Sequence, residues 1–365
     1  MQKNNIQLIN ITSFQDDLIQ WFEAEKRDLP WREDQDPYKV WVSEIMLQQT
    51  RVDTVIPYFN RFIESFPTLH HLAEAGEEEI LKACEGLGYY SRVRNLQSAV
   101  REVKASYNGV VPNSPEEIIS LKGVGPYTAG AILSIAYGIP EPAVDGNVMR
   151  VLSRILLIKE DIAKPKTRKI FEDAVRALIS HENPSSFNQA LMELGALICT
   201  PTSPSCMLCP VNEHCVAFAE GVQKELPVKI KVTKVKKVKL ISAIIKNNKG
   251  EILVQKRPDQ GLLAGLWEFP SFSFDDKKTA TKDMYEDAFA ITFNSRVQLQ
   301  ASRFAEIPHV FSHLKWSIDA YEGMIFDEIS EEILNSQRLR WVSEKEMKQL
   351  AFPVPYQKMF TEYRS

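Results

Sequence analysis

The hydrophobic pattern of this chain changes character once, and that change limits the possible folds more than any other feature. Residues 14–220 carry apolar side chains at helical spacing, with weak strand signals throughout. Beyond residue 240, short apolar runs alternate with turn residues; the segment LISAIIKNNKGEILVQKRP, for example, predicts a β-hairpin. Because 365 residues are more than one hydrophobic core normally serves, we predict two domains.

A lysine-rich segment separates the two patterns. Residues 222–240 contain seven lysines and one glutamate. Such a segment is either a solvated charged tether or a strip that lies on a surface or on an acidic partner. We therefore predict a helical domain at 1–221, a linker at 222–239 and an α+β domain at 240–365.

The bulk composition is that of an ordinary globular protein, with 44% hydrophobic and 25% charged residues. No apolar run approaches the ~18 residues of a membrane span, and the first residues lack the pattern of a signal peptide. We expect a cytoplasmic protein without a membrane partner. The net charge of −4 does not by itself indicate binding to a nucleic acid. Such binding would require a local basic face on this protein.

Four of the five cysteines lie close together in the sequence, with the spacing C-x6-C-x2-C-x5-C. They are Cys199, Cys206, Cys209 and Cys215. In a reducing compartment, clustered cysteines hold metal more often than they form disulfides, and four thiolates bind either zinc or an iron–sulfur cluster. Structural zinc sites usually show two close pairs, and here only one pair is close. The fifth cysteine, Cys84, is predicted to be a small buried side chain.

A glycine turn joins two predicted helices in the middle of the helical region. The first helix starts at Ser114-Pro115, and the second begins near Pro126 after Gly123-Val124-Gly125. Glycine permits a positive φ and a close approach of another backbone, and the amides of the turn and of the next helix form an anion site suited to a phosphate. The alternative is an ordinary tight corner between helices.

Two carboxylates stand out by position. A helix predicted to begin at Asp36-Pro37 and to run past Leu47 places Glu44 within an apolar stripe. Desolvation there would raise the pKa of the Glu44 carboxyl, which suits a general acid. The alternative is that Glu44 is an exposed helix glutamate. Asp145 precedes a helix, where it is an N-cap or a carboxylate held ionised by the helix end. One neutral and one charged carboxylate is the pattern of glycosidic-bond cleavage.

The window LKGVGPYTAGAILS, followed by VDGNV, resembles the helix–hairpin–helix DNA glycosylase superfamily, which includes endonuclease III and the MutY-type adenine glycosylases. The resemblance extends from LPWR at 29–32 through the last clustered cysteine. It implies that Gly123 and Gly125 bind a DNA phosphate, with a monovalent or divalent cation as a further expectation there. It also implies that the segment 199–215 holds one 4Fe–4S cluster.

The same resemblance implies roles in catalysis. Glu44 would protonate N7 of a flipped adenine, and Asp145 would stabilise the oxocarbenium-like sugar or form a transient covalent link to it, beside Asn147. Endonuclease III-like enzymes carry a lysine where this chain has Tyr127. Because a phenol cannot form an imine, we predict base removal without strand cleavage, and we expect Tyr127 to hydrogen-bond near Asp145 and to line the sugar pocket.

Other positions resemble family residues one at a time. Gln49 and Tyr89 match family residues that insert into the base stack beside the flipped base. The alternatives are that Gln49 is a surface amide and that Tyr89 is a core aromatic residue. The positions matching the adenine pocket are Arg32, Leu47 and Gln189.

The C-terminal third resembles a Nudix domain at GLLAGLWEFPSF, but the metal-binding box that normally follows is missing, so pyrophosphohydrolase activity is not expected. In MutY-type proteins this domain recognises 8-oxoguanine, and the matching loop here is Phe311-Ser312-His313, with Ser312 as the main polar contact.

The resulting prediction is an all-α helix–hairpin–helix glycosylase domain with an iron–sulfur loop, followed by an α+β Nudix-like domain. We expect a monomeric, nucleoid-associated, monofunctional adenine DNA glycosylase acting on duplex DNA with adenine opposite 8-oxoguanine or G; other repair or replication proteins could bind the linker. Three alternatives stay open: a bifunctional pyrimidine glycosylase–lyase, a non-enzymatic iron–sulfur DNA-binding protein and a Nudix-type nucleotide hydrolase.

Overall fold

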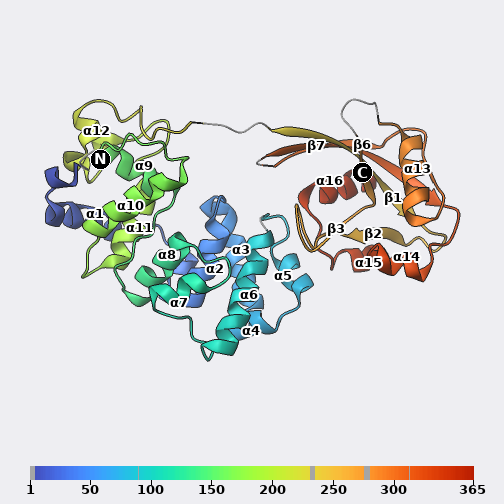
Figure 1. Cartoon of the computed structure of the whole chain (residues 1–365), viewed down its shortest axis with the longest axis horizontal. Helices are drawn as coiled ribbons and strands as arrows, with labels where there is room; N and C mark the ends of the chain where they lie inside the picture. The colour runs from blue at the N-terminus through green and yellow to red at the C-terminus, as the bar shows by residue number, and fades with distance from the viewer. Residues whose placement is uncertain (1–4, 89, 231–234, 275–279, 312) are drawn as a thin grey trace. The chain divides into compact units, whose positions relative to one another are not determined.

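The computed structural model describes residues 5–88, 90–230, 235–274, 280–311 and 313–365. Its internal contacts divide the chain into two compact units (Figure 1). We call Met1–Glu74 with Asn95–Lys231 the helical unit, and Ala75–Arg94 with Val232–Ser365 the mixed unit. Each unit is described by itself.

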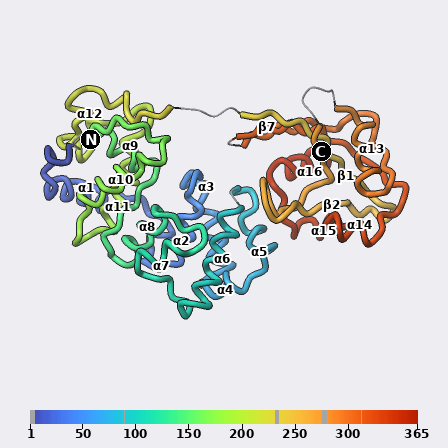
Figure 2. The backbone as a smooth tube through the Cα atoms, viewed as in Figure 1, coloured from blue at the N-terminus to red at the C-terminus, as the bar shows by residue number. Residues whose placement is uncertain are grey.

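The helical unit contains no strand among its described residues. Its helices are α1 (Ile11–Glu25), α2 (Pro37–Leu47), α3 (Val52–Ser65), α4 (Leu69–Glu74), the larger part of α6 (Tyr90–Ser106), α7 (Pro115–Ser120), α8 (Pro126–Tyr137), α9 (Gly146–Ile155), α10 (Pro165–Leu178), α11 (Pro184–Leu197) and α12 (Val216–Ala219). Short 3-10 helices lie at Asn5–Leu8, Pro30–Arg32, Cys206–Leu208 and Asn212–His214. Apolar side chains of α1, α9, α10 and α11 form one large buried cluster. Helix α11 also contacts α8, which packs on α2, so these helices bring distant parts of the chain together (Figure 2).

Local signals explain where the helices that matter for the site begin and end. Asp36 caps α2 by accepting a hydrogen bond from the Tyr38 amide at 2.8 Å, and Ser114 caps α7 in the same way. Helix α2 ends at Leu47 and not beyond it as predicted, because the chain turns at Gln49, whose φ of 60° is left-handed.

The glycine turn connects α7 and α8 as a helical hairpin. Gly123 has a φ of +79°, and a Cβ placed there would lie 2.7 Å from the Cβ of Asn95, so both the backbone angle and the close approach favour glycine. Gly125 is the N-cap of α8 and has an ordinary φ, and nothing lies within 4 Å of where its Cβ would be. The protein itself therefore does not explain the second glycine.

The mixed unit is built on one mixed β-sheet. Its strands are β1 (Lys236–Lys246), β2 (Ile252–Lys256), β3 (Trp267–Glu268), β4 (Ser271–Phe274), β5 (Val297–Leu299), β6 (Ala305–Val310), β7 (Leu314–Ile325) and β8 (Leu339–Val342). The predicted hairpin is confirmed, since β1 and β2 pair in antiparallel fashion with Lys246 opposite Ile252. The central pair, β1 and β7, is parallel along its whole length; the order is β3-β2-β1-β7-β5, with β4 on β1, β6 on β7 and β8 on β2.

Helices cover both faces of this sheet. One face packs against α13 (Lys282–Phe293) and α14 (Glu331–Ser336), whose buried aromatic anchors include Tyr285 and Phe289. The other packs against α15 (Glu344–Met347) and α16 (Val354–Arg364), around Phe269 and Tyr356. The α+β class predicted for the C-terminal third is therefore confirmed.

Residues 75–94 cluster with the mixed unit. Helix α5 (Glu77–Ala83) and the start of α6 supply Leu81 and Tyr90 to a small apolar cluster with Leu266 and Ala351. Lys256 lies 2.8 Å from Glu78, which adds an ion pair to this contact. The domain ranges 1–221, 222–239 and 240–365 stay a prediction, because a division of the chain by its internal contacts does not show which segments fold independently.

The lysine-rich segment is ordered at both of its described ends. Arg154 donates to the carbonyl of Leu226 at 3.0 Å, and the Ile162 amide donates to Val228 at 3.0 Å, so 222–228 returns to the helical unit. Residues 236–239, predicted to be linker, instead form the first part of β1, because they pair in register with β7. Among the described residues, no helix is long and apolar enough to cross a bilayer.

Candidate active site

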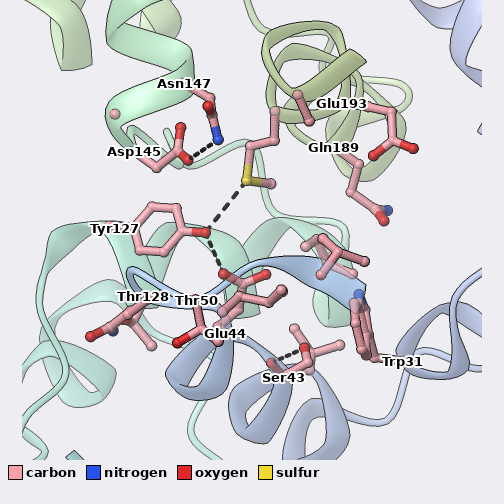
Figure 3. A pocket seen from close by; sticks show the side chains of 18 of the residues that line it. Trp31, Ser43, Glu44, Thr50, Tyr127, Thr128, Asp145, Asn147, Gln189 and Glu193 are labelled. Carbon is pink, nitrogen blue, oxygen red and sulfur yellow. Dashed lines mark hydrogen bonds between the residues drawn. The ribbon is translucent and has the colours of Figure 1, made fainter. Parts of the chain in front are cut away.

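The helical unit contains a cavity of about 650 Å³, within the range typical of small-molecule sites. It is lined by α2, the glycine turn, α8, the start of α9 and α11 (Figure 3). The predicted site residues that the structure brings together here are Arg32, Glu44, Leu47, Gln49, Gly123, Gly125, Tyr127, Asp145, Asn147 and Gln189. They come from segments spread over more than 150 residues of sequence, and the fold brings them to one cavity.

Glu44 projects from the buried middle of α2 and is only 5% exposed. Burial raises the pKa of its carboxyl to about 7, and the negative charge of Asp145 acts in the same direction. A hydrogen bond from Tyr127 and the charge of Arg32 oppose that shift. Glu44 therefore holds a proton near neutrality, as a general acid must.

Tyr127 lies in the first turn of α8 and faces α2. Its hydroxyl donates a hydrogen bond to Oε2 of Glu44 and lies 3.4 Å from the sulfur of Met192 (Figure 3). We expected this hydroxyl to bond near Asp145. Its partner is Glu44, because α8 packs on α2, and Asp145 of the same cavity is close enough to raise the pKa of the phenol. Burial and the neighbouring carboxylates raise the pKa of the phenol well above 10, so it remains a donor.

Asp145 is both the N-cap of α9 and part of the cavity wall. Its Oδ1 accepts from the Val148 amide at 2.7 Å, and its Oδ2 accepts from the side chain of Asn147 at 2.9 Å (Figure 3). The capping role and the site location therefore hold at once. Burial raises the pKa of this carboxyl, against the prediction from the helix end alone, while the two hydrogen bonds and Arg150 oppose the rise.

One wall of the cavity carries a buried ionic cluster that the sequence analysis missed. Glu193 of α11 binds the guanidinium groups of Arg27 and Arg32, and Arg32 Nε donates to Oε1 of Gln189 at 3.1 Å. The available signal was spacing, since Glu193 follows Gln189 by four residues and so shares its helix face.

A chain of hydrogen bonds leads from Asp145 to the cysteine loop. Arg150 Nη2 donates to Oδ1 of Asn147 at 2.8 Å, and Arg150 Nε donates to the Cys199 carbonyl at 2.8 Å. Arg154 then donates to the sulfur of Cys199 at 3.2 Å and to the carbonyl of Thr200 at 2.8 Å. Both arginines escaped prediction because no local pattern distinguishes them from surface charges of α9.

The four clustered cysteines are free thiols that line one small cavity beside Arg154. Burial raises the pKa of Cys209 to about 12 and that of Cys215 to about 11, so these thiols would ionise only with a cation to bind them. Among the described residues, no three cysteine, histidine or acidic side chains converge as ligands of a single ion. Four thiolates facing one cavity are a ligand set that either zinc or an iron–sulfur cluster can use.

The remaining predicted positions are placed only in part. Gln49 is exposed at the rim of the cavity. Phe311 packs edge-on against Trp316 with ring centroids 5.0 Å apart, and His313 is exposed beside it. Tyr89 and Ser312 lie outside the described residues. Cys84 is fully buried, as predicted.

Comparison with known families agrees with the two units. Residues 42–177 match the model of the HhH-GPD superfamily base excision DNA repair protein, and residues 241–362 match the NUDIX domain model. A solved thermostable thymine-DNA glycosylase superposes with a TM-score of 0.51 at 26% identity, covering 57% of this chain and 97% of that one. An endonuclease III–DNA complex superposes with a TM-score of 0.51 at 24% identity, covering 61% and 100%, which supports the fold alone.

Whole-length relatives narrow the assignment. The adenine DNA glycosylase of Homo sapiens is 32% identical, over 97% of this chain and 74% of its own length. That of Buchnera aphidicola from Schizaphis graminum is 31% identical over 95% and 97%, and that of Arabidopsis thaliana is 37% identical over 82% and 55%. The chain thus spans just over half of the plant relative. The helical hairpin and the two carboxylates of one cavity define a DNA glycosylase of the helix–hairpin–helix class, joined to a Nudix-like unit. Within that class, the chain belongs to the adenine DNA glycosylase family.

Proposed function

We propose that this chain hydrolyses the N-glycosidic bond of adenine mispaired with 8-oxoguanine, or with G, in duplex DNA. The observation that carries this proposal is the pair of carboxylates in one cavity, with Glu44 at a pKa of about 7 and Asp145 oriented by two hydrogen bonds. The names of the relatives supply the base, since they are called adenine DNA glycosylases.

The chemistry follows from the different states of the two carboxylates. Glu44 donates its proton to N7 of the flipped adenine, the C1′–N9 bond breaks, and its electron pair stays with the base. Asp145, as the carboxylate, stabilises the positive charge that develops on the sugar. Water then adds to C1′ and gives up one proton, which restores the acid form of Glu44. Tyr127 cannot form an imine with the sugar, so the strand stays uncut.

Recognition is divided between the walls of the cavity and the turn. Arg32, Leu47 and Gln189 line the space that the adenine would enter. The open volume at Gly125 and the positive φ of Gly123 suit a phosphate at the N-terminus of α8, with a cation beside it as a further expectation. Gln49 at the rim would contact the stack that the base leaves.

The cofactor in this proposal is one 4Fe–4S cluster on Cys199, Cys206, Cys209 and Cys215. When bound, it would cross-link the loop 199–215 to itself by four metal–sulfur bonds. Arg154 would then donate its hydrogen bond to a thiolate, which strengthens that bond. A broad visible absorption that is lost in Cys209→Ser would support this cluster, and a colourless protein containing zinc would reject it.

The mixed unit would recognise the oxidised base opposite the adenine. Phe311 and His313 flank the loop that carries this role in the proposal, together with Ser312. The metal-binding box of active Nudix hydrolases is missing from residues 271–295, which disfavours nucleotide hydrolysis as the function.

Single-turnover cleavage of a duplex with adenine opposite 8-oxoguanine tests the proposal. We expect free adenine and an intact strand bearing an abasic site. Failure to release adenine would reject the function. Efficient covalent trapping with borohydride would instead favour a glycosylase–lyase.

A further inference from the structure

Glu193 has an environment that a simple helix-packing role does not require. Its side chain is 2% exposed, yet it accepts five hydrogen bonds from two arginines. Three come from the amide, Nε and Nη2 of Arg27 at 3.1, 2.8 and 2.8 Å, and two from Nη1 and Nη2 of Arg32 at 3.3 and 3.0 Å. Although burial opposes it, this pairing lowers the pKa of Glu193 to about 2, so the carboxylate is ionised at any physiological pH.

The orientation of Arg32 depends on this carboxylate. Nη1 and Nη2 of Arg32 both donate to Glu193, and Nη1 also donates to the Arg27 carbonyl at 3.0 Å. The Arg32 guanidinium plane therefore has little freedom to rotate. Its Nε then holds Oε1 of Gln189, whose Nε2 donates to the Ser185 hydroxyl at 3.2 Å. The donors and acceptors on this wall are therefore fixed before any base enters, and Figure 3 shows Gln189 and Glu193 projecting from the same helix.

The same carboxylate sets the charge of the wall. The charged groups lining the cavity besides Glu44 are Arg27, Arg32, Asp145, Arg168 and Glu193. Without Glu193, two adjacent guanidinium groups would face a site where a base must become positively charged. Arg32 already favours the ionised form of Glu44, and an uncompensated pair of arginines would favour it further.

We propose that Glu193 is a positioning residue of the base pocket, which fixes Arg32 and Gln189 and cancels enough cationic charge to keep Glu44 a proton donor. This inference rests on the proposed adenine excision and adds a residue to it. It contrasts with the reading that Glu193 only ties residues 27–32 to α11, in which case its charge would be irrelevant to the acid. A buried ion pair alone is weak evidence for a stabilising role.

The test is the pH dependence of single-turnover adenine release by the full-length protein. In Glu193→Gln, the loss of a negative charge should move the alkaline limb of the profile to lower pH by about half a unit or more. Glu193→Asp keeps the charge, so its limb should stay near that of the wild type even if its rate falls. Glu268→Gln is the matched control, because it removes a buried carboxylate bonded to Arg257 in the mixed unit, and its limb should not move.

Arg27→Gln provides a variant of opposite sign. This substitution removes one cation, and Glu193 then pairs with Arg32 alone, so the alkaline limb should move to higher pH. This measurement tests the inference even if Glu193→Gln does not fold. The inference is overturned if the alkaline limb of Glu193→Gln coincides with that of the wild type. It is also overturned if Glu193→Asp shifts the limb as far as Glu193→Gln does, or if Arg27→Gln leaves the limb unmoved. If the wild type is active, these results reject the inference alone; an inactive wild type rejects the proposed function as well.

Discussion

The helical unit and the mixed unit each contain a buried glutamate that accepts a hydrogen bond from a tyrosine. In the helical unit, Tyr127 donates to Glu44, and in the mixed unit, Tyr356 donates to Glu268 at 2.8 Å. Glu44 is 5% exposed and Glu268 is 7% exposed, and burial raises the pKa of both.

The two glutamates differ in whether a cationic side chain is bonded to them and in whether they line an open cavity. Glu268 is bonded directly to Arg257 and packs in the core between the sheet and α16. Glu44 has only the tyrosine among the hydrogen-bond partners that the described residues provide, and it lines a cavity large enough for a base. Burial beside a tyrosine is therefore not a mark of catalysis. An open cavity and the lack of a bonded cation distinguish Glu44, the proposed acid, from Glu268.

The largest expected effect comes from neutralising each glutamate in turn. Glu44→Gln should lower the rate of adenine release by about 10²–10⁴-fold, the usual contribution of a general acid. Glu268→Gln should change that rate less than threefold, and should instead lower the free energy of unfolding by about 1–3 kcal/mol through the loss of its charged hydrogen bonds. Single-turnover rates and denaturant titrations measure both, and comparable rate losses would erase the distinction between the two units.

A second expected effect is on stability against pH. The folded protein keeps a proton on Glu44 up to about pH 7, whereas the unfolded chain releases it near the ordinary value of 4.5. The wild type should therefore lose about 3 kcal/mol of stability relative to Glu44→Gln between these two pH values, with no further loss above them. Denaturant titrations of both proteins from pH 4.5 to 8 measure this; a difference independent of pH would show that the Glu44 carboxyl titrates normally.

A third prediction concerns the approach of α11 to α9 beside the site. A Cβ added at Gly195 would lie 2.7 Å from the Cβ of Asn147, so Gly195→Ala must displace the side chain that orients Asp145. We expect a loss of about 1–3 kcal/mol in stability and a rate lowered roughly tenfold. Gly76→Ala is the control, because its added Cβ meets nothing within 4 Å. Unchanged activity in Gly195→Ala would mean that Asp145 does not depend on Asn147.

The smallest expected effect compares the two tyrosines. Tyr127→Phe removes a donor that favours the ionised form of Glu44, so the pKa of that carboxyl should rise further and the alkaline limb of the rate profile should move up by about half a unit. Tyr356→Phe should leave the profile unchanged and cost stability alone. A limb that moves down in Tyr127→Phe would contradict the direction of this hydrogen bond.

Local signals in the sequence predicted much of this structure. The caps Asp36 and Ser114, the hairpin between β1 and β2 and the burial of Glu44 all depend on residues within a few positions of one another. The pairing of Glu44 with Asp145 came instead from the family resemblance, and the structure places both carboxylates on one cavity.

Contacts between distant segments were not predictable in this way. The partner of Tyr127, the arginines around Glu193 and the parallel pairing of β1 with β7 all depend on how separate elements pack. A tyrosine in the first turn of a helix has several possible partners within reach, and only the packing of α8 on α2 selects one of them.

The parallel pairing at the centre of the mixed sheet has a consequence for how the chain folds during its synthesis. Lys236 pairs with Leu314, so the first half of this pair leaves the ribosome well before the second. Until β7 emerges, the buried stretch Ile241–Ile245 of β1 lacks its central neighbour and exposes apolar side chains with unpaired amides. Nascent chains stalled within residues 250–310 should accordingly be the ones that recruit chaperones and aggregate, whereas the helical unit, whose contacts lie upstream, can already have folded.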